Sequence, residues 1–285
     1  MQVRFAVLRG ICQTPAYVAH ELGLFADAGL QSSLTVAATA WQAPAQLASR
    51  ACEFAVMPWT RVACAARDEA PLVVCCGSGV EEAAIVVRHG LDPGAVRRVA
   101  VPREGGMKDL TALGLTDSLG WHDVDFLRMP SGDGAILALI GQAVDAAAMV
   151  EPYATMMEAL GIGRVVKRTG DVWPGAPGCS LASRADCDHA LQAAVVEVYV
   201  HAIARVHAQP DEAAEIAARY IGMRADWIRQ ALRVNRPDAE AVRNQRAIDA
   251  VLGVMARHGY LERPPADYLD LRALDALQLR RASVA

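Results

Sequence analysis

The sequence predicts a two-lobed α/β protein with a ligand cleft between its lobes and a helical C-terminal region. Three observations support this prediction. Strand-like and helix-like segments alternate from residue 1 to about residue 168, which is typical of βαβ units in parallel sheets. Two segments rich in glycine, proline or charge, 77–82 and 170–178, are candidate crossings between lobes. From about Asp186 onward the composition becomes that of a nearly all-helical chain.

The chain is predicted to begin with a strand, a loop and a short helix. "VRFAVL" (3–8) reads as the strand, and Thr14 is expected to cap the helix with Pro15 at its first position. Gly23 is expected to end this helix in the left-handed conformation. Ligands of open α/β sheets lie beyond the carboxyl ends of the strands, so the loop 9–15 is a candidate ligand contact.

The alternation is predicted to continue through the next elements, where short apolar runs are separated by turn residues. The expected strands are 33–38, 53–57, 71–76, 83–88, 97–102, 123–129, 145–150 and 164–168. The expected helices are 44–50, 59–69, 106–113, 133–142 and 152–160. With both crossings in place, lobe 1 is discontinuous (residues 1–80 plus 178–285), and lobe 2 is the inserted segment 81–177.

Composition excludes some functional classes. With 285 residues, 53% of them hydrophobic, the chain can bury a sizeable core. Its net charge of −4 and the lack of a basic stripe argue against nucleic acid as a partner. No apolar run approaches the roughly 20 residues of a transmembrane helix. The most apolar long segment, 191–208, is interrupted by Glu197, His201 and Arg205.

Cysteine usage and the start of the chain predict a cytoplasmic location. The seven cysteines are an odd number without a regular framework spacing, which fits a reducing compartment. Strand-like sequence begins at Val3, which leaves no room for a secretory leader. A periplasmic location is the alternative if the sequence has been trimmed.

Two motifs resemble solute-binding proteins of the nitrate/sulfonate/taurine and thiamine-precursor type. "PAYVAHELGLFADAGL" (15–30), followed by a strand, is similar to the opening of that family, and "GQAVDAAAMVEPYATMMEALG" (141–161) resembles its Asp-Ala to Glu-Pro motif. The resemblance implies a type II periplasmic-binding fold that closes about a hinge on a small organic solute. It also implies an ABC permease as partner if the protein is exported. The segment 95–110 departs from the family pattern.

An enzyme on the same scaffold is the alternative interpretation. Pyrimidine synthases of thiamine biosynthesis and enzymes of the menaquinone pathway share this scaffold, so such an enzyme would act on a small ring compound. Glu104 or Glu151 would then serve as an acid or base. Cys75 and Cys76 only faintly resemble the cysteine-rich motif of the synthases. Binding without turnover is favoured, and no cofactor is predicted.

Candidate ligand-binding residues follow the expected strands. Trp41 and Trp59 could form cleft walls that stack a flat ring or hold a cation, or could instead pack at the rim of the core. Arg9 and Arg61 could hold an anionic group. The full set is Arg9, Thr14, Tyr17, Trp41, Trp59, Arg61, Ser78, Glu104, Gly106, Met107, Glu151, Tyr153 and Trp173, with Gly105, Ser131 and Asp133 in the same loops.

Motifs for metal binding and catalysis are missing from the sequence. The histidines and cysteines show no H-E-x-x-H or C-x-x-C spacing, so no metal site is predicted. "HDVD" (122–125) fits a solvated loop better than a metal site. No nucleophile elbow or phosphate-binding loop is present.

Overall fold

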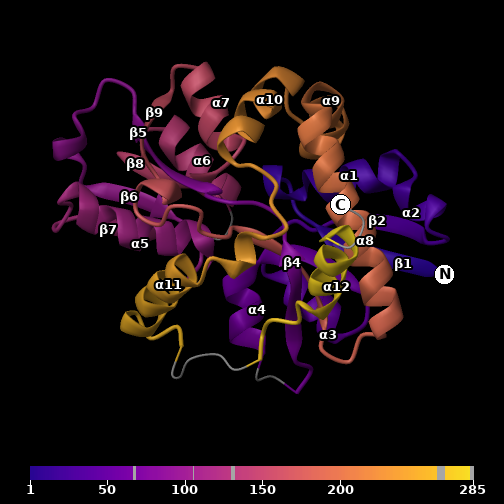
Figure 1. Cartoon of the computed structure of the whole chain (residues 1–285). Coiled ribbons are helices and arrows are strands. Elements are labelled where there is room, and N and C mark those ends of the chain that lie inside the picture. The colour runs from indigo at the N-terminus through magenta and orange to yellow at the C-terminus, as the bar shows by residue number, and fades with distance from the viewer. Residues whose placement is uncertain (67–68, 105, 130–131, 262–266, 283–285) are drawn as a thin grey trace.

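The protein contains two five-stranded sheets with helices packed against them (Figure 1). The computed structural model describes residues 1–66, 69–104, 106–129, 132–261 and 267–282. Within these residues the strand orders are β2-β1-β3-β10-β4 and β7-β6-β8-β5-β9. The predicted two-lobed α/β class is therefore confirmed.

The first sheet contains the N-terminal strands and one strand from far along the chain. Its members are β1 (Gln2–Val7), β2 (Gln31–Val36), β3 (Phe54–Pro58), β4 (Leu72–Gly77) and β10 (Cys179–Arg184). β1 pairs in parallel with β2 and β3, whereas β10 lies antiparallel between β3 and β4. The expected parallel pairing is therefore found among β1, β2 and β3, whereas the antiparallel β10 was not predicted. β10 returns from the second sheet and so enters the first in the opposite direction.

The second sheet is built from consecutive strands. They are β5 (Ala83–Arg88), β6 (Arg98–Val101), β7 (Asp125–Arg128), β8 (Ala146–Val150) and β9 (Gly163–Arg168). β6 pairs in parallel with β7 and β8, and β5 lies antiparallel to β8 and β9. β5 is the outgoing strand of the crossing, so each sheet has one antiparallel strand that belongs to a connection between the sheets.

Helices connect the strands, and a helical region follows β10. The helices between strands are α1 (Thr14–Glu21), α2 (Leu24–Asp27), α3 (Gln42–Ala48), α4 (Trp59–Ala65), α5 (Met107–Leu119), α6 (Gly132–Ile140) and α7 (Tyr153–Ala159). Those after β10 are α8 (His189–Ala208), α9 (Pro210–Ile221), α10 (Ala225–Val234), α11 (Gln245–Arg257) and α12 (Arg272–Ala282). α8 and α9 lie beside α1 of the first sheet. α10 lies beside α7 and α11 beside α5, both of the second sheet, so this region reaches helices of both sheets (Figure 1).

The junction between β1 and α1 differs from its prediction in one respect. A 3-10 turn (Ile11–Gln13) precedes α1, so Gln13 takes the N-cap position and Thr14 is already helical. The Gln13 side chain accepts a hydrogen bond from the Leu8 amide at 3.1 Å. The expected capping role of Thr14 is therefore wrong, whereas Gly23 adopts the predicted left-handed conformation with a φ of 72°.

Aromatic contacts hold the first sheet to its helices. Phe5 of β1 lies between Phe25 and Phe54, with ring centroids 4.9 and 5.6 Å away. All three rings are fully buried, and each contributes about 1.5–3 kcal/mol to folding. Tyr17 of α1 stacks on Tyr220 of α9 at 4.3 Å, which joins the N-terminal helix to the C-terminal region.

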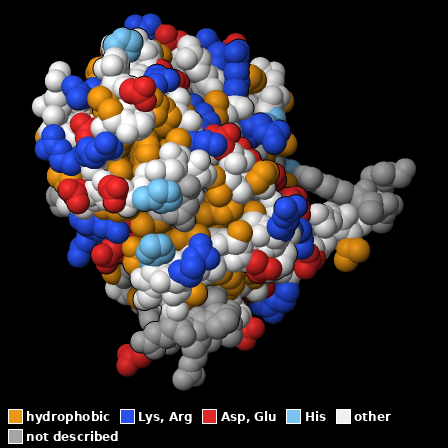
Figure 2. All heavy atoms as spheres, turned by 90° about the vertical axis from the view of Figure 1, so that its left-hand side faces the viewer, with side chains coloured by type: hydrophobic (Ala, Val, Ile, Leu, Met, Phe, Trp, Pro, Cys, Tyr) orange, Lys and Arg blue, Asp and Glu red, His pale blue; other side chains and the backbone are white. Residues whose placement is uncertain are grey.

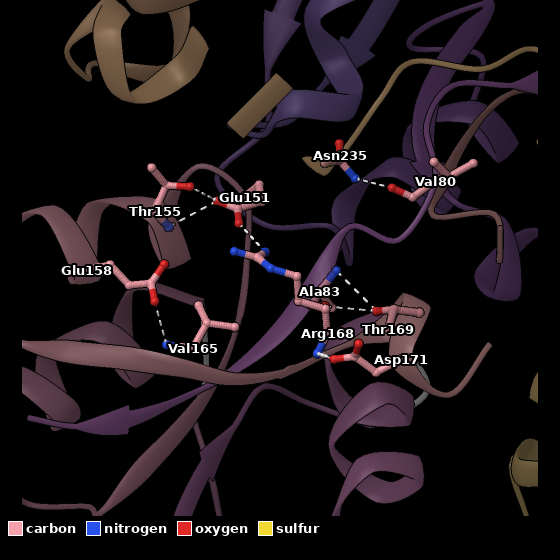
Figure 3. Close-up of polar contacts among 10 residues, drawn as sticks. All are labelled: Val80, Ala83, Glu151, Thr155, Glu158, Val165, Arg168, Thr169, Asp171 and Asn235. Carbon is pink, nitrogen blue, oxygen red and sulfur yellow. Dashed lines mark hydrogen bonds and ion pairs between the residues drawn. The ribbon is translucent and has the colours of Figure 1, made fainter. Parts of the chain in front are cut away.

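Two antiparallel segments connect the sheets. The amide of Gly178 donates to the carbonyl of Gly79 at 2.8 Å, and that of Glu81 donates to the carbonyl of Ala176 at 3.0 Å. Asn235 donates to the carbonyl of Val80 at 2.7 Å, which attaches the C-terminal region to the same place (Figure 3). The crossings therefore lie side by side. The lobe boundaries at residues 80/81 and 177/178 stay a prediction.

The surface in Figure 2 belongs to the side of the molecule that carries the second sheet. Basic and acidic side chains are interspersed on this face, with apolar areas between them. In the described part of the chain, none of the helices is long and apolar enough to cross a membrane.

Candidate functional site

A cavity of about 320 Å³ lies between the two sheets. One wall comes from the segments that follow β1, β2 and β3, and the opposite wall from the segments that follow β6 and β8 together with the start of α6. This is the position at which open α/β sheets bind their ligands. The volume is in the range of small-molecule sites.

The cavity brings together about half of the residues that the sequence proposed. Those that line it are Arg9, Trp41, Arg61, Gly106, Met107, Glu151 and Tyr153, and Asp133 lies with them. With Asp133 included, they come from segments that follow six separate strands, at the sheet edges where the sequence analysis expected a ligand. Gly105 and Ser131 lie outside the described residues.

A stacked pair, Arg61 on Trp41, forms one corner of the cavity. The guanidinium carbon lies 3.3 Å from the centroid of the indole ring. Nη2 of Arg61 donates to the carbonyl of Glu104 at 3.0 Å, whereas its buried Nε has no acceptor among the described residues. Burial lowers the pKa of Arg61 to about 10, so the side chain remains charged at neutral pH. A half-buried cation with a buried, unused donor atom favours an anionic partner.

Three further cations line the same cavity. The guanidinium carbon of Arg103 lies 4.9 Å from the Trp41 ring, on the second-sheet side. Arg9 and Arg103 are exposed, whereas Lys108 is only partly exposed. Burial lowers the pKa of Lys108, and the Glu82 carboxylate opposes that effect. Among the described residues the Lys108 ammonium has no hydrogen bond or ion pair.

The acidic residues of the cavity are mostly occupied by other partners. Figure 3 shows the Glu151 carboxylate between Thr155 and Arg168, and it accepts hydrogen bonds from both. Glu82 accepts a hydrogen bond from the Cys12 thiol at 2.9 Å. Of the three lining carboxylates, only Asp133 then lacks such a partner within the described chain. The thiol leaves the charge of Glu82 in place, whereas Arg168 offsets that of Glu151. The four lining cations therefore outnumber the remaining two carboxylates, which gives the cavity an excess of positive charge.

Apolar side chains supply the rest of the lining. Ile11 and Met107 are fully buried, and Ile136 is nearly so. Tyr153 begins α7, and burial raises its pKa to about 12, so the phenol remains neutral and can donate a hydrogen bond. A ligand in this cavity would meet positive charge at one end and apolar surface elsewhere.

The structure places three of the proposed aromatic residues in the core, outside the cavity lining. Trp59 is 1% exposed, and its indole nitrogen donates to the carbonyl of Pro177 at 2.9 Å. Trp173 packs so closely on α5 that a Cβ atom at Gly114 would lie 2.5 Å from its ring. Tyr17 donates from its hydroxyl to the Leu8 carbonyl and stacks on Tyr220. Each has a structural partner that explains its position.

Three other proposed residues also lie outside the lining. Ser78 is buried in a crossing segment, where its hydroxyl bonds to the Cys12 carbonyl and to the hydroxyl of Tyr199. Thr14 is fully buried in α1. Glu104 is exposed and contributes its backbone carbonyl to Arg61.

Cys12, Glu82, Lys108 and Cys179 line the cavity but were not among the proposed residues. Cys12 lies within the proposed loop 9–15, and Lys108 follows the proposed Met107. Glu82 ends the first crossing, and Cys179 directly follows the second. The crossings lie at the base of any cleft between two lobes. Their terminal residues were therefore the available signal for this part of the site.

The fold and the cavity agree with the comparison to protein families. The sequence profile of the NMT1-like family matches residues 1–222. The chain belongs to this family. The predicted resemblance to solute-binding proteins of the nitrate/sulfonate/taurine and thiamine-precursor type is thereby confirmed for this NMT1-like chain. A search of curated protein sequences gives no match.

Three solved structures similar to this NMT1-like chain are named as ligand-binding proteins. A ligand-binding component of an ABC-type import system from Staphylococcus aureus, with zinc bound, has a TM-score of 0.85 at 15% identity, over 96% of this chain and 97% of that one. The alkanesulfonate-binding protein SsuA from Xanthomonas axonopodis pv. citri, bound to MOPS, has a TM-score of 0.78 at 14% identity, over 95% and 98%. The periplasmic nitrate-binding protein NrtA from Synechocystis has a TM-score of 0.76 at 16% identity, over 93% and 83%. At these identities the similarity shows a shared fold.

Proposed function

We propose that this protein reversibly binds a small organic anion with a flat or apolar body in the cavity between its sheets. The stacked Arg61–Trp41 corner carries the proposal, because it offers a charged donor group beside an aromatic face. Arg9, Arg103 and Lys108 add positive charge around it. The acidic group of the solute would lie against these cations, and its body against Trp41 and Met107.

The proposal includes closure of the lobes on the solute. Both walls contribute cations, since Arg61 and Arg9 come from the first sheet, and Arg103 and Lys108 from the second. An anion between them would therefore attract both lobes and favour a closed state over an open one. We place the lobe boundaries at residues 80/81 and 177/178 for this motion.

The similar structures include a sulfonate-binding protein and a nitrate-binding protein, both of which take anions by name. We propose by analogy that an ABC permease receives the solute if this chain is exported, as the periplasmic location of the nitrate-binding protein suggests. A regulator or enzyme would receive it in the cytoplasm, the location that we predicted from the seven cysteines, all free of disulfides. The three similar structures are named as binding components, which does not favour the enzyme alternative.

A thermal-shift screen tests the proposal directly. The panel pairs each aromatic or aliphatic sulfonate and carboxylate with a neutral amide or alcohol of the same shape. We expect stabilisation by one or more anions, with the neutral counterparts inactive, because ligand binding to the native state raises its apparent stability. Stabilisation by neutral compounds alone would contradict the proposed solute class, and slow consumption of the stabilising compound would contradict binding without turnover.

A further inference from the structure

The base of the cavity holds a cluster of metal-binding side chains that the proposed function does not use. The Sγ atoms of Cys12 and Cys179 and a carboxylate oxygen of Glu82 all lie within 4.8 Å of one another. All three residues are buried, with exposed fractions of 3%, 5% and 5% for Cys12, Cys179 and Glu82. All three also line the cavity, so the cluster is reachable from it.

The three residues come from different parts of the backbone. Cys12 lies in the turn after β1, Glu82 at the outgoing crossing and Cys179 at the start of the returning β10. The thiol of Cys12 donates to Glu82 at 2.9 Å and contacts the Asn235 side-chain oxygen at 3.3 Å. The polar atoms therefore already point toward a common centre, although 70 and 97 residues separate them along the chain.

We propose that Cys12, Glu82 and Cys179 form a binding site for one thiophilic divalent cation of the zinc class. Two thiolates and one carboxylate are a ligand set that Zn²⁺ accepts, and three protein ligands leave a fourth tetrahedral position open. Zn–S bonds of about 2.3 Å place two sulfurs about 3.8 Å apart, so the cluster would contract by about 1 Å at most. This inference goes beyond the proposed function and does not rest on it.

The surroundings of the cluster nearly balance the charge of the bound state. Both thiols must lose a proton to ligate the ion. Two thiolates and one carboxylate with a divalent cation carry a net charge of −1. The neighbouring Lys108 ammonium offsets that charge.

The fourth coordination position of the proposed site would face the cavity. Asn235 and the crossing segments enclose the cluster on its other sides, since Asn235 also donates to the Val80 carbonyl and a Cβ atom at Gly79 would lie 2.9 Å from the Cys12 sulfur. A water molecule or an acidic group of a ligand would complete the coordination. The ion would also attach the loop after β1 to both crossings.

Titration of the reduced, chelator-stripped, untagged protein with Zn²⁺ tests the site. We expect one ion per chain, release of two protons per ion and a rise in melting temperature. Substitution of Co²⁺ should give the thiolate-to-cobalt charge-transfer band of a tetrahedral centre. Cys12→Ser and Cys179→Ser should each weaken Zn²⁺ binding by at least about 100-fold, and Glu82→Gln by about 10- to 100-fold. Cys64→Ser, which removes an exposed thiol away from the cluster, should leave binding unchanged.

A second measurement needs no variant. Bound Zn²⁺ should slow alkylation of Cys12 and Cys179 by iodoacetamide, as located by mass spectrometry, without slowing that of Cys64. Failure to bind one ion, or binding that Cys64→Ser abolishes and the cluster variants do not, would overturn the proposal. We run the organic-anion screen on chelator-stripped protein, so its result does not depend on this metal site. Failure of one proposal can therefore be told from failure of the other.

Discussion

Arg61 lies 3.3 Å from the ring of Trp41 in the cavity, whereas Arg224 lies 5.4 Å from the ring of Trp227 on the outside of α10. The outer arginine is fully engaged, because Nε and Nη2 donate to the two carboxylate oxygens of Asp226 at 2.9 and 2.8 Å. Arg61 has one carbonyl acceptor and a buried Nε without one in the described chain.

The two environments move the pKa of the arginines in opposite directions. Burial lowers the pKa of Arg61 to about 10, while the hydrogen bonds to Asp226 raise that of Arg224. Other surface arginines follow the second pattern, since Arg184 forks onto Asp186 and Arg272 onto Asp270. A surface arginine is thus paired with a neighbouring carboxylate, whereas Arg61 in the cavity has no such partner within the part of the chain that the structure describes. We expect the unpaired arginine to bind an anionic ligand and the paired arginines not to.

The largest expected effect concerns a third tryptophan, which lies in the core. Trp59→Ala should lower the free energy of unfolding by about 3–5 kcal/mol, because it leaves a large cavity and removes the bond to Pro177. Urea denaturation measures this loss. Trp227→Ala is the control and should cost far less, since its ring is partly exposed. Equal losses of unfolding free energy in the two variants would contradict the core position of Trp59.

The next effect separates the two arginines. Arg61→Ala should weaken binding of the stabilising anion by about 10- to 100-fold, the range for hydrogen bonds to a charged group of about 1.5–3 kcal/mol. Arg224→Ala should leave the affinity unchanged, because its guanidinium lies outside the cavity lining. Isothermal titration calorimetry measures both. An unchanged affinity in Arg61→Ala would refute the role of the cavity corner.

A smaller effect separates the two rings. Trp41→Ala should weaken binding by about tenfold, or roughly 1.4 kcal/mol, because the ligand loses an aromatic wall and Arg61 loses its stacking partner. Trp41→Phe should recover part of the affinity. Trp227→Ala should bind as the wild type does. Comparable losses in Trp41→Ala and Trp227→Ala would indicate a general effect on the fold.

The smallest expected effect is the contribution of a surface Arg–Asp pair to stability, which depends on pH. The hydrogen bonds from Arg184 lower the pKa of Asp186 from 3.8 to about 2 in the folded protein. A lowered folded-state pKa adds stability that is complete above pH 4 and is lost as the pH falls from about 4 to 2. Asp186→Asn should therefore lose less stability than the wild type across that window, and added salt should reduce the difference. Acid-unfolding curves at two salt concentrations measure it, and identical curves would contradict it.

The sequence predicted most strands because they are short, largely apolar runs between turn residues. The segment 83–88 is one such run, and β5 has the same limits. β10 escaped prediction because its buried residues include Ser180 and Ser183, which interrupt the apolar pattern. Both serines are satisfied inside the sheet, Ser180 by the Met57 carbonyl and Ser183 by the Arg184 carbonyl. Hydropathy read from the sequence does not show that a buried serine has a hydrogen-bond partner in the folded chain.

The positions of the strand ends predicted part of the cavity lining, but not the direction of each side chain. Trp41 and Trp59 both follow strands, yet only Trp41 lines the cavity, because Trp59 begins α4 and turns its indole onto the returning crossing. That direction depends on a residue 118 positions away. Cys12, Glu82 and Cys179 meet only through the topology of the crossings, so no local spacing reveals them.

Three segments of the chain, rather than one, meet where the two sheets are connected. Two chain segments cross side by side, and Asn235 fastens a third segment to Val80 and to the Cys12 thiol. Attachments at one place would restrict twisting of the two lobes against each other more than the hinge motion proposed above. Under the proposed closure, the two cavity walls would then approach and separate along one bending motion and meet in the same alignment each time.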